Sequence, residues 1–410
     1  MGPDAHSFEG RFAVVGAGVI GDVHARAIRS LPEAAELRLV VSTREASARR
    51  LAEAQGAAGW STDYQAVLAG PGIDAVSICT PSGTHADLAV AALEAGKHVM
   101  VEKPIDVSLE AADRILAAER ASGRKVAVVS QHRFDPSTEQ VMAAIRAGDL
   151  GRLTSGIAST AWWRGQSYYD SGRWRGTWAM DGGGAIMNQT IHTIDLLVAM
   201  LGVPTEVFAY AARLAHERIE VEDTAVAVVR FAGGALGLIH GTTAAYPGLD
   251  AGVRVFGTKG SAVISDDRLV YLHGNPGPVP ELTTPLPMTE TNQVTGDQTP
   301  AAGGHGLGAA HVAQFADFVD AIRSQRPVRV GPARPGPCSP WSSASIGRRA
   351  STAGPRGSPR RSGRGEPRRR ARPPAPRPGR PATPRRSTPR RSRPWRWRRP
   401  GCRDGNRRRA

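Results

Sequence analysis

Residues 11–130 alternate short apolar runs with amphipathic stretches of helical length. The apolar runs include "RFAVV", "ELRLVV", "IDAVSIC", "HVMVE" and "KVAVVS", and the stretches between them include "EASARRLAEAQ" and "SLEAADRILAAERAS". Strands that are apolar at nearly every position are typical of a parallel sheet buried on both faces, and amphipathic helices supply the cover. The pattern therefore predicts a doubly wound α/β domain.

The pattern changes beyond about residue 200. Three long β-prone runs, "TEVFAYAARL", "DTAVAVVRFAGGALGLIHGTTAAY" and "AGVRVFGTKGSAVISDDRLVYL", are broken by glycine-containing turns. Such runs predict strands that are joined by tight connections. This part of the chain is expected to be rich in β-structure.

The first apolar run leads into Gly16-x-Gly18-x-x-Gly21 and then into a helical pattern. The three glycines suit a tight turn, a close approach of the backbone to a pyrophosphate, and tight packing of helix on strand. The next strand ends at Ser42-Thr43-Arg44, about twenty residues later. An acidic residue there would bind the ribose 2′-hydroxyl of NAD, whereas a small hydroxyl residue beside an arginine suits a 2′-phosphate. NADP is therefore favoured, and NAD stays open.

The charge of the chain is divided unevenly. The net charge of +16 over 410 residues combines 28 basic and 35 acidic residues in 1–332 with 25 arginines and two acidic residues in 333–410. The Arg- and Pro-rich segment 333–410 is predicted to be disordered. Two interpretations are a nucleic-acid arm, with Trp395 and Trp397 stacking on bases, and a frameshifted translation of GC-rich DNA. The codon pattern favours the frameshift, so nucleic acid is a partner only if the tail is genuine.

The sequence contains no clear signal for export, for a membrane or for a metal site. The N-terminus has no basic and apolar leader, and no apolar run has membrane-spanning length, so a cytoplasmic protein without membrane contact is expected. Cys79 is the only cysteine in residues 1–332, which argues against a disulfide framework. The histidines show no ligand spacing, so no metal site is expected.

One lysine stands out in "VMVEKPIDV", residues 99–107. The chain holds four lysines against 49 arginines, and Lys103 follows an apolar run directly. Lysine loses its proton at accessible pH when it is desolvated, whereas arginine stays charged. Lys103 is thus a candidate proton carrier, and an ordinary surface lysine at a strand end is the alternative.

The segment 161–178, "AWWRGQSYYDSGRWRGTW", holds four of the eight tryptophans of the chain. Aromatic faces stack on the C–H faces of sugars, and arginines bind hydroxyls, carboxylates or phosphates. A loop that merely packs on the sheet is the other interpretation. The candidate substrate-binding residues in this segment are Trp163, Arg164, Tyr169 and Arg175.

Three further motifs, "CTPSGTH" (79–85), "EKP" (102–104) and "GGGAIMNQTIHTIDLL" (182–197), follow the glycine motif in order. In this order they resemble the glucose–fructose oxidoreductase/inositol dehydrogenase (Gfo/Idh/MocA) family over residues 11–331. The resemblance implies an α/β fold with a Rossmann domain, 1–130, and a substrate-binding and oligomerisation domain, 131–332, with a large, open, mostly antiparallel sheet. The exposed face of that sheet is expected to form dimers or tetramers.

The resemblance also implies an activity. It is a hydride transfer between NAD(P) and a secondary alcohol of a sugar, sugar derivative or cyclitol. The alternatives within the same fold are a redox-neutral, glycosidase-like enzyme that uses NAD and a non-catalytic regulator that senses nucleotide.

The resemblance assigns roles to individual residues. Lys103 is the expected base and His192 the group that orients or relays the proton, while Arg133 is placed near the domain junction. Asn188 stands where inositol dehydrogenase-like members have Asp; because Asn cannot accept a proton, it is expected to hold a substrate hydroxyl. Asp195 is expected to have a structural role. The residues assigned to the cofactor are Gly16, Gly18, Val19, Ile20, Gly21, Ser42, Thr43, Arg44, Thr80, Pro81, His85, Glu102 and Lys103.

Overall fold

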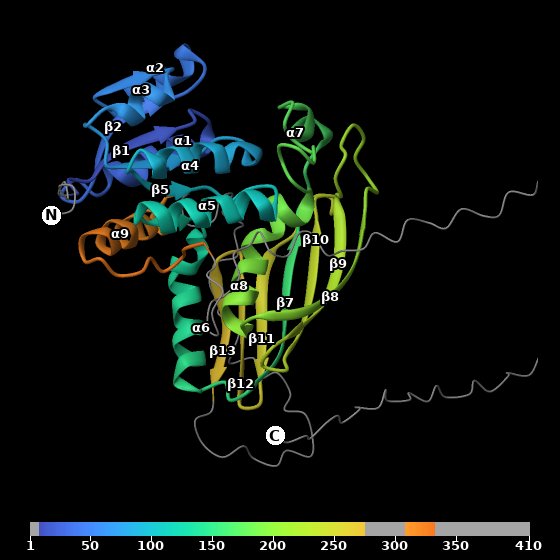
Figure 1. Cartoon of the computed structure of the whole chain (residues 1–410). Helices are drawn as coiled ribbons and strands as arrows, with labels where there is room; N and C mark the ends of the chain where they lie inside the picture. Colours follow the sequence, from blue (N-terminus) through green and yellow to red (C-terminus); the bar gives the residue numbers. More distant parts are fainter. Residues whose placement is uncertain (1–7, 275–307, 333–410) are drawn as a thin grey trace, which may run out of the picture. The chain divides into compact units, whose positions relative to one another are not determined.

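The computed structural model describes residues 8–274 and 308–332, which all belong to one compact unit, Met1–Gly354 (Figure 1). The predicted tail, 333–410, lies outside the described residues. None of the described helices combines the length and the apolarity that crossing a membrane requires.

The first sheet has six strands in the order β3-β2-β1-β4-β5-β6, and all its pairs are parallel. This order is that of a dinucleotide-binding doubly wound fold, in which ligands bind beyond the carboxyl ends of the strands. The strands are β1 (Arg11–Val15), β2 (Glu36–Val41), β3 (Gly59–Ser61), β4 (Ala75–Ile78), β5 (His98–Val101) and β6 (Val126–Val128). The helices between them are α1 (Val19–Arg29), α2 (Glu45–Gln55), α3 (Tyr64–Ala69), α4 (His85–Glu94) and α5 (Leu109–Ser122), with a 3₁₀ turn η1 (Ser82–Thr84) before α4.

Both faces of this sheet are buried, as the continuous apolar runs predict. Phe12 and Val14 of β1 pack with α1 in one cluster, whereas Ala13 and Val15 pack with α3, α4 and α5 in another. Successive side chains of a strand point to opposite faces, so helices are needed on both sides. The carboxyl ends of the strands are thereby held at fixed positions.

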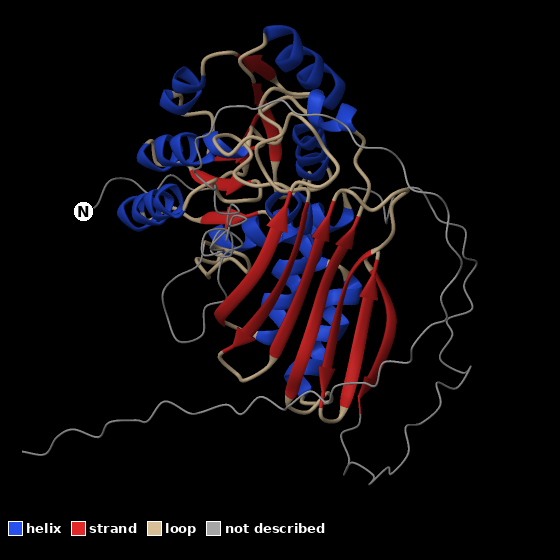
Figure 2. Cartoon of the chain, turned by 90° about the vertical axis from the view of Figure 1, so that its right-hand side faces the viewer, coloured by secondary structure: helices blue, strands red, loops and turns tan. Residues whose placement is uncertain are grey.

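The second sheet has seven strands in the order β13-β12-β11-β7-β10-β9-β8 (Figure 2). Only β7 and β10 pair in parallel; the other pairs are antiparallel. The strands are β7 (Leu153–Ala161), β8 (Pro204–Ala212), β9 (Thr224–Phe231), β10 (Leu236–Thr242), β11 (Ala251–Gly257), β12 (Gly260–Ser265) and β13 (Arg268–Gly274). Helices α6 (Pro136–Ala147) and α8 (Ile191–Leu201) cover one face, and the short α7 (Gln166–Asp170) follows β7.

The opposite face of this sheet stays uncovered within the described chain. In β9, Val229 and Phe231 are buried under α8, whereas Val226 and Val228 on the other face are about half exposed. This alternation is typical of an antiparallel sheet with one packed face. The predicted fold class, a Rossmann domain followed by a domain with a mostly antiparallel sheet, is confirmed.

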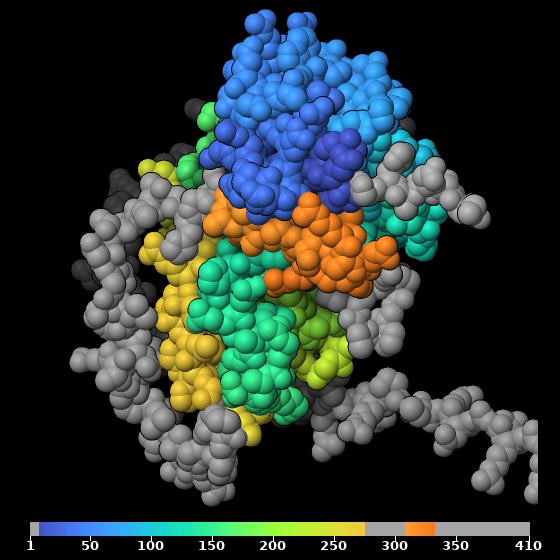
Figure 3. Space-filling model, turned by 90° about the vertical axis from the view of Figure 1, so that its left-hand side faces the viewer, coloured from blue at the N-terminus to red at the C-terminus, as the bar shows by residue number. Residues whose placement is uncertain are grey.

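The last described segment of the chain, residues 308–332, packs on the first sheet. Helix α9 (Ala309–Arg323) packs Phe315 and Phe318 against Phe12 and buries them completely, at about 1.5–3 kcal/mol each. Gln314 bonds the backbone at the end of β6, donating to the carbonyl of Val128 and accepting from Ser130 N–H. Figure 3 shows α9 (orange) between the N-terminal residues (blue) and α6. The division at residue 130 stays a prediction, and residues 308–332 pack on the first sheet.

Candidate active site

The glycine loop after β1 leaves no room for side chains at two of its three glycines. A Cβ on Gly16, whose φ is +110°, would lie 2.4 Å from the carbonyl oxygen of Cys79, and one on Gly21 would lie 2.0 Å from that of Gly16. A Cβ on Gly18 would meet nothing within 4 Å. Gly16 and Gly21 thus shape the turn and the packing of α1, and Gly18 faces open space.

The start of α1 has the features of an anion site. Gly18 is the extended N-cap residue and supplies no side-chain hydrogen bond, and Val19 is 83% exposed. The first N–H groups of a helix without such a cap are free to bind a pyrophosphate. Gly16, Gly18, Val19, Ile20 and Gly21 therefore fit a dinucleotide.

The end of β2 carries the groups expected at the adenosine ribose. Thr43 and Arg44 are exposed and directly precede α2, and Arg44 N–H bonds Ser42 Oγ at 3.4 Å. No described residue forms an ion pair or hydrogen bond with the Arg44 guanidinium. This leaves the guanidinium accessible to a ligand.

The loops after β4 and β5 are tied together by His85 at the start of α4. Its Nδ1 contacts the carbonyl oxygen of Pro104 at 2.9 Å, and its Nε2 contacts that of Thr80 at the same distance. Thr80 Oγ1 also bonds Thr84. Thr80, Pro81 and His85 thus hold the "CTPSGTH" loop against the "EKP" loop.

Glu102 fixes the backbone of the following lysine. Its Oε2 accepts from Lys103 N–H at 3.1 Å, and its Oε1 bonds His24 Nε2 at 2.9 Å. Although burial opposes it, the bond and charge of His24 lower the pKa of Glu102 to about 2. The His24 pKa is raised to about 10: burial lowers it, but Cys79 and Glu102 outweigh burial. Sequence reasoning missed His24, although it follows the glycine motif by three residues.

Lys103 reaches across to the second domain. Its Nζ donates to the backbone carbonyl of Asn188 at 2.9 Å, and the peptide bond to Pro104 is cis. Burial lowers the pKa of Lys103; Glu102 and Asp181 oppose this shift, and Arg175 adds to it. The amine is thus fixed in direction and favours its neutral form more than a free lysine does.

Asn188 and His192 stand on one continuous turn of chain. A π-helical turn, η3 (Ala185–Thr190), leads into α8, and such turns are frequent at functional sites. Glu222 caps its start by accepting from Gly184 and Ile186 N–H at 3.0–3.1 Å. A Cβ on Gly184 would lie 1.6 Å from the Glu222 carbonyl oxygen, so this glycine is required by packing. Glu222 lies far away in sequence and no motif identifies it.

Asp181 supplies a carboxylate next to Asn188. Its Oδ1 accepts from Asn188 Nδ2, and its Oδ2 accepts from Gly176 N–H at 2.8 Å. Burial raises the pKa of Asp181, while these bonds and the charge of Lys103 oppose the rise. Sequence reasoning missed this residue, which directly precedes the "GGG" motif.

His192 has ring nitrogens that no described residue hydrogen-bonds. Its ring meets that of His132 edge to face, with centroids 5.0 Å apart. Burial, together with the charges of Lys103, His132 and His311, holds the pKa of His192 well below its ordinary value of 6.5. His192 is therefore neutral at physiological pH and open to a ligand hydroxyl.

The aromatic segment surrounds two arginines. The Arg164 guanidinium lies over Trp162 at 5.0 Å and Tyr168 at 5.5 Å, and Arg175 lies over Tyr168 at 4.3 Å and Trp174 at 4.5 Å. Arg164 also donates to Gln189 Oε1 at 3.0 Å, which joins this segment to η3. Arg164 is thus linked to Asn188 through Gln189, and Arg175 joins the same set of contacts through Tyr168.

Three other expected substrate residues are engaged elsewhere. Arg133 binds Asp195 through two bonds of 2.6 Å, which agrees with the structural role expected of Asp195. The Tyr169 hydroxyl bonds Thr243 Oγ1 at 2.7 Å, and Trp163 packs edge to face on Tyr246. Their contact with substrate stays a prediction.

Two side-chain groups have donor atoms within 4.8 Å of one another, a spacing that could hold a metal ion: His24, Glu102 and His311, and His132, Asp135 and Asp267. In each group two of these atoms already bond each other, His24 to Glu102 at 2.9 Å and His132 to Asp135 at 2.8 Å. His311 Nε2 is buried without a partner among the described residues. No sequence spacing predicts either group.

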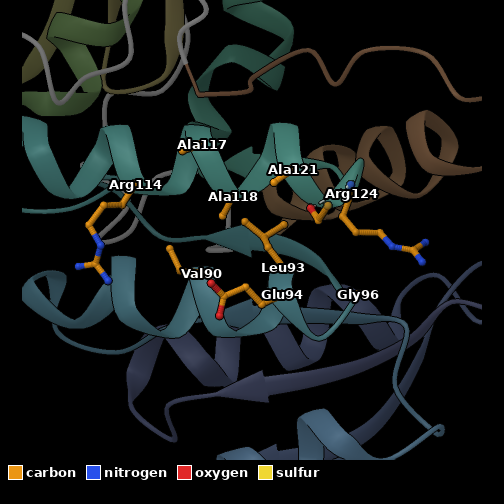
Figure 4. A pocket seen from close by; sticks show the side chains of 10 residues that line it. Val90, Leu93, Glu94, Gly96, Arg114, Ala117, Ala118, Ala121 and Arg124 are labelled. Atoms are coloured by element: carbon orange, nitrogen blue, oxygen red, sulfur yellow. Dashed lines mark hydrogen bonds between the residues drawn. The ribbon is translucent and has the colours of Figure 1, made fainter.

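A groove also opens between α4 and α5, lined by Val90, Leu93, Glu94, Arg114, Ala118 and Arg124 among others (Figure 4). It contains none of the expected site residues. The polar groups described above, and not this groove, therefore define the candidate active site.

Known proteins share both domains. A model of an oxidoreductase family with an NAD-binding Rossmann fold matches residues 10–130, and the GFO/IDH/MocA C-terminal domain matches residues 138–263. The chain is 30% identical to myo-inositol 2-dehydrogenase of Thermotoga maritima, over 61% of this chain and 73% of that protein. It is 32% identical to inositol 2-dehydrogenase of Rhizobium meliloti, over 64% of this chain and 77% of that protein.

A solved structure supports the same relationship. The WlbA dehydrogenase of Bordetella pertussis, in complex with NADH and UDP-GlcNAcA, is 31% identical, with a TM-score of 0.66 over 78% of this chain and 90% of that chain. The two family models together match more than half of the sequence. The chain therefore belongs to the Gfo/Idh/MocA family of NAD-binding oxidoreductases.

Proposed function

We propose that the chain oxidises a secondary alcohol of a sugar, sugar derivative or cyclitol, with Lys103 as the base. One observation carries this: the Lys103 amine, at the end of a Rossmann strand, is bonded to the backbone of the turn that bears Asn188 and leads to His192. The relatives named as inositol dehydrogenases support the substrate class.

The cofactor residues are the glycine loop, the Ser42–Arg44 end of β2 and the loops after β4 and β5. Bound NAD(P) supplies a carbon that accepts the hydride of the alcohol. The chain itself must hold the alcohol and take its proton. Lys103 is suited to take the proton, because burial lowers its pKa and increases the neutral fraction at working pH.

His192 and Asn188 hold the reacting hydroxyl in this proposal. Neutral His192 offers one nitrogen that donates and one that accepts, and no described residue uses either. Asn188 Nδ2 is bonded to Asp181 and its Oδ1 accepts from Gln189, so its side chain is held in one orientation. No Asp–His relay passes through position 188, and Lys103 is left as the proton acceptor.

We further propose that NADP is preferred and NAD is accepted. Exposed Arg44, without a described partner, is suited to the 2′-phosphate, and no acidic side chain stands at residues 42–44 to bind a 2′-hydroxyl. The related WlbA structure contains NADH, which supports use of the unphosphorylated cofactor as well.

We also propose a homo-oligomer formed through the second sheet. Its uncovered face exposes large apolar side chains, including Phe208 at 59% and Tyr210 at 65%, together with Val226, Val228, Leu236 and Leu238. An apolar patch of this kind is typical of a protein–protein interface. Because cells keep nicotinamide cofactors in their cytoplasm, the proposal includes a cytoplasmic location.

The test is a panel of sugars, polyols and cyclitols with NAD or NADP, followed by absorbance of the reduced cofactor. Lys103→Ala is expected to reduce kcat by about 10²–10⁴-fold and to leave the cofactor Kd within about threefold. Lys125→Ala, on the same domain but with no described side-chain hydrogen bond or ion pair, is the matched control. Equal turnover by wild type and Lys103→Ala would refute the role, and product formed without net cofactor reduction would indicate the redox-neutral alternative.

A further inference from the structure

Two guanidinium groups face the candidate site without a carboxylate partner. Neither Arg164 nor Arg175 forms an ion pair with a described residue, whereas Arg218 binds Asp170 of the same segment at 2.8 Å and Arg133 binds Asp195. Arg164 Nε is buried and has no partner among the described residues. Burial of unpaired polar and charged groups is unfavourable, so such groups indicate a missing ligand.

The stacking of these arginines leaves their edges free. Tyr168 contacts both guanidinium groups, Trp162 contacts that of Arg164, and Trp174 contacts that of Arg175. Aromatic rings cover the flat faces of a guanidinium, while its N–H groups point outward in the plane. Of these N–H groups, only Arg164 Nη2 donates to a described residue, Gln189.

The nearby carboxylates are already engaged. Both oxygens of Asp181 accept hydrogen bonds, from Asn188 and Gly176, and this carboxylate also lies near Lys103. Glu222 is occupied by the N–H groups that start η3. Neither carboxylate forms an ion pair with Arg164 or Arg175, although the charge of Arg175 helps to lower the pKa of Asp181.

Gln189 joins the arginine pair to the reacting groups. Its Nε2 donates to the Tyr168 hydroxyl and to Asn188 Oδ1, both at 3.0 Å, and its Oε1 accepts from Arg164. Asn188 in turn accepts from Lys103 through its backbone. An anion at the arginines would therefore belong to the same small molecule as the alcohol at Lys103.

We propose that Arg164 and Arg175 form an anion subsite and that the substrate is an acidic sugar, bearing a carboxylate or a phosphate. The proposal rests on the proposed oxidation of a sugar alcohol and narrows its substrate class. Guanidinium edges bind both anions through paired N–H donors, and Trp162 and Trp174 offer flat faces beside them for a sugar ring.

The test measures binding, so it does not depend on turnover. The full chain, saturated with NADH or NADPH, is titrated calorimetrically with D-glucuronate, D-galacturonate, D-glucose 6-phosphate and D-glucose. At least one acidic sugar is expected to bind ten or more times tighter than glucose, and the carboxylate and phosphate probes separate the two sources of the anion. Equal affinity for the acidic and neutral sugars, or no binding by any acidic probe, overturns the proposal.

Variants assign the effect to the arginine pair. Arg175→Gln is expected to weaken acidic-sugar binding by about 10–100-fold and glucose binding by less than threefold, because it removes a charge-assisted contact. Arg175→Lys keeps the positive charge but loses the paired N–H donors of the guanidinium. Its affinity for acidic sugars should therefore lie between those of wild type and Arg175→Gln. Arg173→Gln, an exposed arginine two residues away, should change neither. Equal losses for Arg175→Gln and Arg173→Gln contradict the proposal.

The two proposals fail in different ways. If acidic sugars bind through Arg175 but Lys103→Ala turns over as fast as wild type, the oxidation mechanism fails and the anion subsite stands. If Lys103→Ala loses turnover while acidic and neutral sugars bind alike, the subsite fails and the mechanism stands. Cofactor binding and thermal unfolding of each variant confirm that it is folded.

Discussion

The cofactor side and the substrate side of the site obtain their groups in different ways. On the cofactor side, each proposed residue comes from a short motif at the end of a parallel strand, and the sheet order brings the strand ends together. On the substrate side, the groups around Asn188 come from separate parts of the chain: Asp181, Glu222 and Arg164. The first side is positioned by backbone geometry, the second by side-chain hydrogen bonds.

The difference predicts how each side responds to substitution. Gly16 and Gly21 lie against backbone carbonyls that do not move aside, so changes there affect folding and cofactor binding together. Asp181 holds another side chain and lies near Lys103, so a change there alters catalysis with less effect on the fold. Four substitutions test this contrast, beginning with the largest expected effect.

The largest effect is expected from Glu102→Gln on the cofactor side. It breaks the buried pair with His24, and the loss of one partner of such a pair costs about 3–5 kcal/mol. Urea unfolding at pH 5.5 measures the loss. Glu94→Gln, an exposed residue on α4, is the control and should stay within about 0.5 kcal/mol of wild type.

The pH dependence of that loss follows from the two pKa values. The Glu102 pKa of about 2 lies below its ordinary value, so its contribution is present above about pH 4.5 and is lost as the pH falls through 2. The His24 pKa of about 10 lies above its ordinary value, so its contribution is complete below about pH 6.5 and is lost as the pH rises through 10. The cost of Glu102→Gln should therefore shrink between pH 6.5 and 10; a constant cost over this range contradicts the ion pair.

Asp181→Asn should reduce kcat by about 10–100-fold while the cofactor Kd changes by less than threefold. The amide can still accept from Gly176 N–H, but the negative charge that raises the pKa of Lys103 is gone. The Lys103 pKa should fall further, and the rising limb of the kcat–pH profile should move to lower pH. Movement to higher pH would show that Asp181 does not act on Lys103 through its charge.

The same contrast explains which residues the sequence alone could identify. The glycine loop, Lys103 and His192 lie in short motifs, so the sequence alone could propose them. Glu222 lies 38 positions after Gly184, the residue that it caps, and joins it only when β9 pairs in the sheet. The pairing of Arg133 with Asp195 was equally hidden, because an arginine that binds a substrate and one that binds a buried carboxylate have the same local sequence.

A smaller effect is expected from Arg44→Ala at the end of β2. Loss of one contact to a 2′-phosphate should raise the KM for NADP about 5–30-fold and leave that for NAD within about twofold. The ratio of the two kcat/KM values measures the change. Arg38→Ala, at a partly buried position on the same strand, is the control. If both cofactors respond equally, Arg44 does not recognise the phosphate.

The smallest effect is expected from His132→Gln. The bonds and charges of Asp135 and Asp267 raise the pKa of His132 to about 9 against the effect of burial, so a cation lies against His192 at neutral pH. Its removal should raise the pKa of His192 only slightly, because burial is the main cause of the low value and Lys103 and His311 remain. Titration of ¹³C-labelled histidine, with His192→Asn to assign the signal, measures the shift. A fall in the His192 pKa, or no change in it, would mean that His132 carries no positive charge beside His192.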